Sequence, residues 1–250
     1  MVSSKSLVYT AHPSSYPLAG EHLKVASSEL DITTTPPGGL VVKNLYTPPP
    51  FPLLTPSSYV SFDPYQRGRM RGPPSPFPPE FPLYTLNGII PNLVVSRVLL
   101  SSTPAFQPGD IITGYTGTSQ YTTPTEAEVP GFKLLSNPHN LPLSYFTGIL
   151  AMPGLTAYSG LYEIGRPKKG ETVFVSAAAV AVGSVVGQLA VREGLTVIGS
   201  VGSDEKVGVV EGLGFKGFNY KTESPNDALK RLAPEGIDIC KFTGVGERAG

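Results

Sequence analysis

Cysteine, histidine and tryptophan are scarce in this chain of 250 residues, which has one cysteine, three histidines and no tryptophan. A single cysteine excludes a disulfide framework and any zinc or iron–sulfur site built from several cysteines. The histidines and Cys240 show no metal-ligand spacing, so we expect no metal site. An excess of either charge is also missing, because 19 Lys and Arg residues balance 19 Asp and Glu residues. Binders of nucleic acid or anionic membranes usually need a basic excess, so we expect neither kind of partner.

Long hydrophobic runs are missing too. The longest apolar stretches are interrupted by Gly, Ser or Pro and are shorter than the roughly 20 residues of a membrane helix. Segment 1–5 lacks the charged start and apolar run of a secretory signal. We therefore expect a soluble, cytoplasmic protein.

Glycine and proline are abundant, with 28 and 27 residues. Proline is unevenly distributed, since 23 of the 27 precede position 143. This uneven distribution predicts two domains of different character, over residues 1–142 and 143–250.

The first half has the character of short strands joined by turns. Strands are predicted at 39–46, 93–100 and 111–115, which are rich in β-branched residues and bounded by turn signals. This pattern favours a small β-barrel or sandwich. Segment 48–82 holds 12 prolines, so we expect an extended surface loop there. The arginines at 67, 69 and 71 are expected to be solvated in that loop.

The second half alternates strands with helices. The predicted elements are strand 171–178, helix 182–192, strand 195–201, helix 203–213, strand 217–220, helix 225–232 and a strand starting at 237. Such alternation with short turns predicts a doubly wound parallel sheet.

The turn after the first of these strands is a candidate dinucleotide site. Glycines in such a turn let the backbone approach a pyrophosphate, whose charge lies at the helix N-terminus. Here only Gly183 and Gly187 remain of a glycine fingerprint. Small residues also occur wherever a helix packs tightly on a sheet, so both interpretations stay open.

The end of the second strand bears on which dinucleotide would bind. NAD sites usually place an acid there for the ribose 2′-hydroxyl, whereas NADP sites place a cation near the 2′-phosphate. Here no acid lies between the end of the strand at 201 and Asp204. Lys206 follows in the first turn of a helix that Ser203 can cap. A cation is unfavourable at that helix end unless an anion lies nearby. The alternative is an ordinary solvated lysine.

Several short segments carry a resemblance to a known family. The most specific is 152–158, Met-Pro-Gly-Leu-Thr-Ala-Tyr. The others are 42–46, 63–70, 106–110, 167–178, 187–190, 218–221 and 234–238. Over most of its length the chain resembles the zinc-independent medium-chain dehydrogenase/reductases, in the group of prostaglandin reductases and alkenal double-bond reductases.

The resemblance implies a GroES-like β-barrel domain for the substrate, followed by a Rossmann domain for NADPH. It implies reduction of the C=C bond of α,β-unsaturated aldehydes or ketones, with hydride transfer to the β-carbon. The expected partner is thus a small-molecule enone or enal, and the resemblance also allows a homodimer. An alcohol dehydrogenase or quinone reductase activity on the same fold stays open.

The resemblance also assigns roles to individual residues. Lys206 and Tyr220 would hold the 2′-phosphate, and Met152 and Thr156 would lie near the nicotinamide. The turn facing the pyrophosphate would comprise Val180, Ala181, Val182 and Gly183. For Met152 and Thr156 the alternative is ordinary packing at a domain junction.

Tyr65, in an Asp-Pro-Tyr motif, is the catalytic candidate. By the resemblance it would line the substrate pocket and polarise the carbonyl oxygen. The alternative is a tyrosine that simply packs on the barrel.

Three departures from the family pattern affect these expectations. Val180 replaces a glycine, and a β-branched residue disfavours positive φ and close approach of a pyrophosphate, so weaker NADPH binding is expected. Segment 47–60 resembles nothing in the family, and 240–246 replaces its next turn. We therefore expect an incomplete, C-terminally truncated Rossmann domain. A catalytically impaired NADPH-binding or interaction protein is the alternative function.

Overall fold

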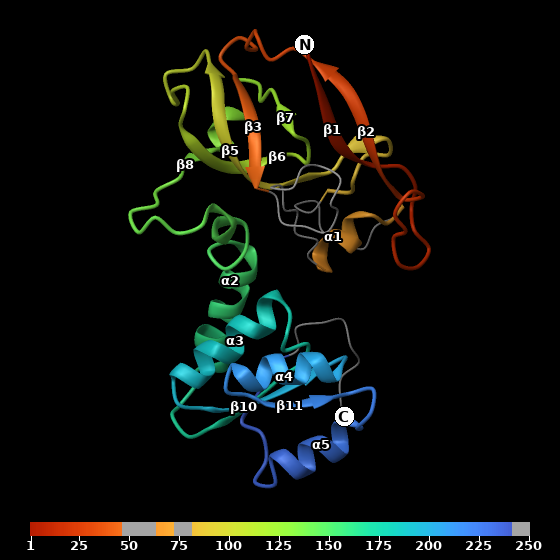
Figure 1. Ribbon diagram of the computed structural model, residues 1–250, viewed down its shortest axis with the longest axis vertical. Coiled ribbons are helices and arrows are strands. Elements are labelled where there is room, and N and C mark those ends of the chain that lie inside the picture. The colour runs from red at the N-terminus through yellow and green to blue at the C-terminus, as the bar shows by residue number, and fades with distance from the viewer. Residues whose placement is uncertain (47–63, 73–81, 242–250) are drawn as a thin grey trace. The chain divides into compact units, whose positions relative to one another are not determined.

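The computed structural model describes residues 1–46, 64–72 and 82–241. The chain separates into two compact units, Met1–Thr147 and Gly148–Gly250, which are described in turn (Figure 1).

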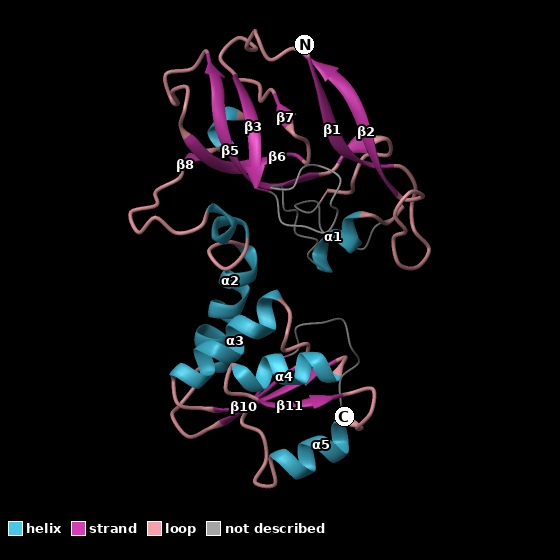
Figure 2. Cartoon of the chain, viewed as in Figure 1, coloured by secondary structure: helices cyan, strands magenta, loops and turns pink. Residues whose placement is uncertain are grey.

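The first unit contains two antiparallel sheets (Figure 2). One has the order β2-β1-β4, formed by Leu23–Leu30, Val2–Tyr9 and Gly88–Ile89. The other has the order β7-β3-β5-β6-β8, formed by Tyr121–Thr122, Leu40–Tyr46, Pro91–Ser101, Ile111–Gly117 and Lys133–Leu134. Strands β3, β5 and β6 confirm the three predicted strands, whereas β1 and β2 were not predicted.

Two apolar clusters form the core of this unit. The larger sheet contributes buried residues at alternate strand positions, such as Leu40 and Val42 of β3 and Val94 and Val98 of β5. The smaller sheet contributes Leu7, Tyr9 and Leu23 to a second cluster. Val41 of β3 and Val95 of β5, at intervening positions, are buried as well, so these strands are covered on both faces there.

Helix α1, Pro64–Arg69, corrects the prediction of a continuous loop over 48–82. No proline lies between Pro64 and Pro73, and proline is tolerated at the first position of a helix. Met70, directly after the helix, is 1% exposed and anchors it in the second core cluster. Segments 48–63 and 73–81 of the predicted loop lie outside the described residues.

The second unit is a four-stranded parallel sheet with the order β11-β10-β9-β12. These strands are Lys216–Asn219, Thr196–Val201, Thr172–Val175 and Ile239–Lys241. The helices between them are α3 (Ala181–Arg192), α4 (Asp204–Gly212) and α5 (Pro225–Leu232). The alternation predicted from the sequence is confirmed, and the bounds of α5 agree at both ends.

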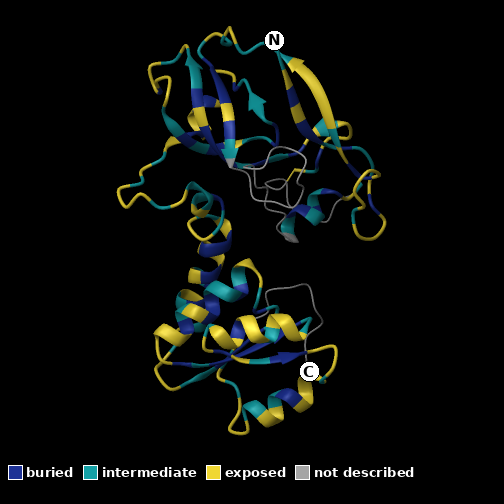
Figure 3. Ribbon diagram, in the orientation of Figure 1, coloured by how far each residue is buried: buried dark blue, intermediate teal, exposed yellow. Residues whose placement is uncertain are grey.

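The two faces of the parallel sheet are covered by different helices. Val173 and Val175 of β9 pack in one cluster with residues of α3 and α4. Phe174, between them, points into the other cluster with Ala228 of α5. The strands are largely buried, and α4 exposes most of its length (Figure 3). Such two-sided burial explains why the parallel strands are continuous apolar runs.

Several short helices between residues 129 and 165 were not predicted. They include the 3-10 helices η1 (Val129–Gly131) and η2 (Leu143–Thr147) of the first unit. In the second unit, α2 (Met152–Tyr158) continues into the π-helix η3 (Ser159–Gly165). A Cβ atom at Gly154 would lie 1.6 Å from the carbonyl oxygen of Ile149, so only glycine fits this position of α2.

Candidate functional site

The turn between β9 and α3 is built from small residues held against the neighbouring strand. The Ala178 amide donates to the Ser200 carbonyl of β10 at 3.0 Å, and the Val180 amide donates to the Ala177 carbonyl at 3.1 Å. Ala177 has a φ of +49°, so the left-handed residue of this turn is an alanine. These bonds fix where the backbone enters α3.

Val180 does not have the backbone conformation that we expected. Its φ is −105° and its ψ is 175°, an extended conformation that β-branched residues adopt readily. The argument that Val180 would have to adopt a positive φ is therefore wrong, because the positive φ belongs to Ala177, whereas the predicted obstruction of a pyrophosphate by its side chain stays a prediction. Val180 occupies the N-cap position of α3, and its side chain is 45% exposed.

Gly183 and Gly187 serve close packing of α3. A Cβ atom at Gly183 would lie 2.5 Å from the Ala177 carbonyl oxygen, and one at Gly187 would lie 2.2 Å from the Phe215 ring. Both glycines are buried. The packing interpretation therefore holds for these two positions. The missing side chain of Gly183 lets the first turn of α3 lie close to the turn that follows β9.

The N-terminus of α3 differs from those of α4 and α5. Ser203 caps α4 by accepting from the Lys206 amide at 3.4 Å, and Ser224 caps α5 by accepting from the Asp227 amide at 3.2 Å. Val180 makes no side-chain cap hydrogen bond to α3, and the first turn of α3 contains no acid. The first amides of a helix have no partner within the helix, so those of Ala181, Val182 and Gly183 are available to an anion.

Lys206 and Tyr220 lie at the same edge of the parallel sheet. Val201, the last residue of β10, is paired with Asn219, the last residue of β11, so the segments that follow both strands leave the sheet together. Lys206 is exposed in the first turn of α4. A Cβ atom at Gly202 would lie 2.9 Å from the Tyr220 hydroxyl oxygen, so the phenol lies over the start of that turn.

Asn219 is a residue of this edge that sequence reasoning missed. Its side-chain Nδ2 donates to Asp204 Oδ1 at 2.7 Å, and its Oδ1 accepts from the Lys221 amide at 3.1 Å. Asn219 is 9% exposed. The available signal was an asparagine near the end of the predicted strand 217–220, because Asn side chains commonly bond to nearby backbone where strands end.

Met152 and Thr156 lie one helical turn apart on α2. Both are exposed within the second unit, and Thr156 Oγ1 donates to the Met152 carbonyl at 2.8 Å. Pro153, Gly154 and Ala157 are the buried residues of the same helix. Met152 and Thr156 therefore do not belong to the core of this unit.

Tyr65 belongs to the first unit and forms a pair with Tyr115. The two hydroxyl oxygens are 2.5 Å apart in a shared hydrogen bond between α1 and β6. Partial burial and, after it, the bond with Tyr65 raise the pKa of Tyr115 above its ordinary value. Tyr115 therefore stays protonated through the neutral range. The sequence had no signal for this pair, because the two residues are 50 positions apart.

The arginines around Tyr65 are not simply solvated, as we had expected. Arg67 donates to the carbonyls of Pro13 and Ser15 at 2.7–3.0 Å. Arg69 donates to the Pro82 carbonyl at 2.8 Å. Both are half-buried and connect α1 to neighbouring segments, because a guanidinium can satisfy several carbonyls at once.

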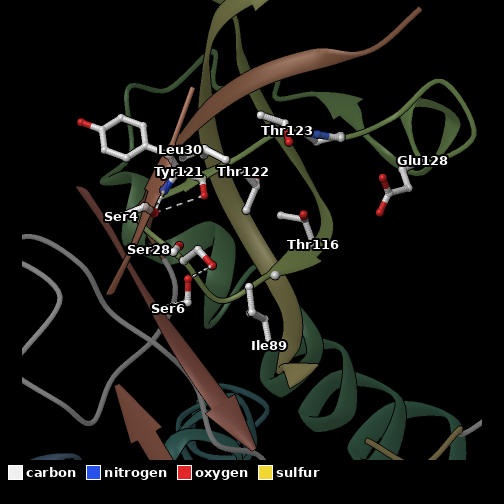
Figure 4. Close-up of a pocket in the computed structure, with 13 residues that line it drawn as sticks. Ser4, Ser6, Ser28, Leu30, Ile89, Thr116, Tyr121, Thr122, Thr123 and Glu128 are labelled. Atoms are coloured by element: carbon white, nitrogen blue, oxygen red, sulfur yellow. Dashed lines mark hydrogen bonds between the residues drawn. The ribbon is translucent and has the colours of Figure 1, made fainter. Parts of the chain in front are cut away.

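A pocket of about 250 Å³ lies elsewhere in the first unit (Figure 4). Its lining is rich in hydroxyl groups, including those of Ser4, Ser6, Ser28 and Thr116. Ser119 donates to Ser6 at 2.7 Å at its wall. No predicted site residue lines this pocket.

Within residues 1–46, 64–72 and 82–241, no three or more His, Cys, Asp or Glu residues cluster as metal ligands would. In the same ranges no helix has the length and apolarity to cross a membrane.

Comparisons with known proteins identify relatives of this chain. Residues 27–130 match the family described as the N-terminal domain of oxidoreductase. NADP-dependent oxidoreductase RED1 of Cochliobolus heterostrophus is 47% identical over 250 residues, covering 98% of this chain and 66% of RED1. The 2-alkenal reductase (NADP(+)-dependent) of Nicotiana tabacum is 42% identical over 253 residues, with the same 98% and 66% coverage.

A solved structure agrees with these relatives. CurA from Vibrio vulnificus, crystallised in complex with NADPH, superposes with a TM-score of 0.77 at 28% identity and covers 98% of this chain and 66% of CurA. The chain thus spans 66% of the length of each of these proteins. The likeness confirms the predicted fold class, a GroES-like domain followed by a Rossmann domain. The zinc-type alcohol dehydrogenase-like protein PB24D3.08c of Schizosaccharomyces pombe is 40% identical over 252 residues, covering 98% of this chain and 68% of that protein. This chain therefore belongs to the medium-chain dehydrogenase/reductases, the family that the sequence resemblance indicated.

Proposed function

We propose that this chain binds NADPH and a small carbonyl substrate, and that it acts as an NADPH-dependent oxidoreductase on the C=C bond of α,β-unsaturated aldehydes or ketones. The observation that carries this proposal is one end of the parallel sheet. The segments that carry Lys206 and Tyr220 leave β10 and β11 at this end, and the turn that leads into the uncapped N-terminus of α3 is bonded to β10 there. The relatives named as NADP-dependent support it.

NADPH fits the chemistry of the residues at this edge. The amides of Ala181, Val182 and Gly183 would donate to the pyrophosphate at the positive end of α3. Lys206 would pair with the 2′-phosphate, and the Tyr220 hydroxyl would donate to it. Met152 and Thr156, exposed on α2, would contact the nicotinamide portion.

Tyr65 would act on the substrate in the first unit. Its hydroxyl would donate to the carbonyl oxygen of the enone or enal, where negative charge develops as the double bond is reduced. Tyr115 would donate in turn to the Tyr65 oxygen, since its raised pKa keeps its proton in place. A chain of two phenols polarises the terminal donor more than one phenol would. Bound NADPH would supply the hydride that the β-carbon receives.

Nucleotide binding is the direct test of this proposal. The fluorescence of NADPH and of NADH is titrated with the wild-type chain, with Lys206→Ala and with Lys216→Ala as a matched control. Lys216 is also exposed but starts β11, at the opposite end of that strand. We expect Lys206→Ala to weaken NADPH binding by about tenfold or more, as for loss of a charged phosphate contact, and Lys216→Ala to leave it unchanged.

Turnover separates the two functions considered. NADPH consumption is followed with a panel of simple enones and enals, for the wild type and for Tyr65→Phe. Reduction by the wild type that falls in Tyr65→Phe supports the proposed enzyme. Binding without turnover supports an NADPH-binding protein without this activity, and equal binding of NADH and NADPH contradicts the proposed cofactor.

A further inference from the structure

Asn219 connects the two segments that carry the proposed 2′-phosphate ligands. Its Nδ2 reaches Asp204, two residues before Lys206, at 2.7 Å. Its Oδ1 accepts from the amide of Lys221, directly after Tyr220, at 3.1 Å. One buried side chain therefore holds the first turn of α4 against the segment that leaves β11.

The two bonds together specify asparagine at this position. The amide nitrogen must donate to a carboxylate, while the amide oxygen must accept from a backbone N–H. An aspartate at position 219 would offer no donor and would place a second carboxylate 2.7 Å from Asp204. An aliphatic residue would make neither bond, and the first turn of α4 would lose its side-chain link to the segment that follows β11.

The same contact engages the acid that most resembles an NAD-type ribose ligand. Dinucleotide folds that bind NAD use a carboxylate after the second strand to bind the ribose hydroxyls. Asp204 is the first acid after β10, but its Oδ1 already accepts from Asn219. A carboxylate also repels a phosphate dianion, so its position near Lys206 matters for either cofactor.

We propose that Asn219 and Asp204 form a positioning pair that makes this site select a nucleotide with a 2′-phosphate over one with a free 2′-hydroxyl. The inference rests on the proposed function, because it assumes that Lys206 and Tyr220 meet the 2′-phosphate. The pair sets the spacing of those two ligands and withholds one carboxylate oxygen from the ribose. Asn219 and Asp204 are positioning residues and need not touch the nucleotide.

Three variants separate these effects. Asn219→Ala breaks the pair and releases the Asp204 carboxylate. Asp204→Ala breaks the pair and removes the carboxylate. Asp204→Asn keeps an oxygen that can accept from Asn219, so it keeps the pair. Dissociation constants for NADPH and NADH are measured by fluorescence titration, and 2′,5′-ADP and 5′-AMP are used as competitors to isolate the 2′-phosphate.

We expect Asn219→Ala to weaken the binding of NADPH and 2′,5′-ADP by about tenfold, because the lost hydrogen bond no longer positions their ligands. The same variant should tighten the binding of NADH, because the released Asp204 carboxylate can then accept from the ribose hydroxyls. Asp204→Ala should weaken the binding of NADPH by about threefold to tenfold without tightening the binding of NADH. Asp204→Asn should keep the wild-type preference within about twofold. Thermal unfolding of each variant reports whether it is folded.

Two outcomes distinguish failure of this inference from failure of the proposed function. If Lys206→Ala weakens NADPH but Asp204→Ala keeps the preference of the wild type, the pair plays no part in selection and the inference is overturned. If the wild type itself shows no preference for NADPH, the proposed cofactor fails first. Asp204 is exposed, so this comparison stands even if Asn219→Ala does not fold.

Discussion

Helices α3 and α4 follow successive strands of the same parallel sheet, yet they differ in how they begin and in where their glycines lie. Helix α3 starts at Val180 with no side-chain cap, whereas α4 starts at Ser203 with one. The glycines of α3 abut other atoms, whereas Gly208 and Gly212 of α4 have no atom within 4 Å of an added Cβ. The glycines of α3 therefore lie on its packed face, whereas those of α4 lie on its exposed face, and Val207 and Val210 pack the other face of α4 on the core.

The largest effect is expected where the glycine packing of α3 is broken. In Gly187→Ala the new Cβ would lie 2.2 Å from the Phe215 ring, so the ring or the helix must move. Overpacking of this kind typically costs about 1–3 kcal/mol of unfolding free energy. Urea unfolding of the chain measures it, and a variant as stable as the wild type would contradict the close packing of α3.

Removal of the α4 cap is expected to have the next largest effect. Ser203→Ala loses the acceptor for the Lys206 amide and should lower the unfolding free energy by about 1 kcal/mol. Ser203→Thr keeps a hydroxyl and is the matched control. Equal stability of the alanine and threonine variants would show that the cap contributes nothing measurable.

A stabilising change is expected at the open glycine of α4. Gly208→Ala adds a methyl group that meets no neighbour, and it improves helix propensity in the interior of α4. We expect a gain of about 0.5–1 kcal/mol in unfolding free energy. Because Gly187→Ala makes the same chemical change, opposite signs for the two variants would confirm that packing, and not propensity, separates α3 from α4.

The smallest effect on stability is expected when α3 receives the kind of cap that α4 has. Val180→Ser supplies a hydroxyl acceptor at the N-cap and should raise the unfolding free energy by about 0.5 kcal/mol. The same hydroxyl would compete with an anion for the first amides of α3, so NADPH should bind slightly more weakly. Parallel unfolding and NADPH titrations of Val180→Ser and Val180→Ala test both, and tighter NADPH binding by the serine variant would contradict the proposed role of this helix end.

The two units differ in how much of their fold could be predicted. In the second unit every predicted strand and helix is present, because apolar runs and helical segments alternate over short distances along the chain. In the first unit, β1 escaped prediction. It contains three serines, and Ser6 bonds to Ser119 113 positions away. Long-range pairing of polar strands leaves little local pattern to detect.

For the candidate site, the sequence supplied residues but not their contacts. The family resemblance assigned Lys206 and Tyr220 to the 2′-phosphate, which stays a prediction, and parallel register brings their segments to one edge. Asn219 and Tyr115 were missed, since each acquires its role from a partner 15 or 50 positions away. The error at Val180 has the same origin, because φ at a turn depends on how the neighbouring strand holds the backbone.

Residue pattern alone specified the strand–helix alternation of the second unit and the scarcity of metal-ligating side chains, because local periodicity and composition are properties of the chain itself. Folding decided which glycines are obligatory, which alanine takes the left-handed conformation and which acid Asn219 binds. Those outcomes depend on atoms brought within a few ångströms from distant positions, and a linear pattern does not encode such distances directly.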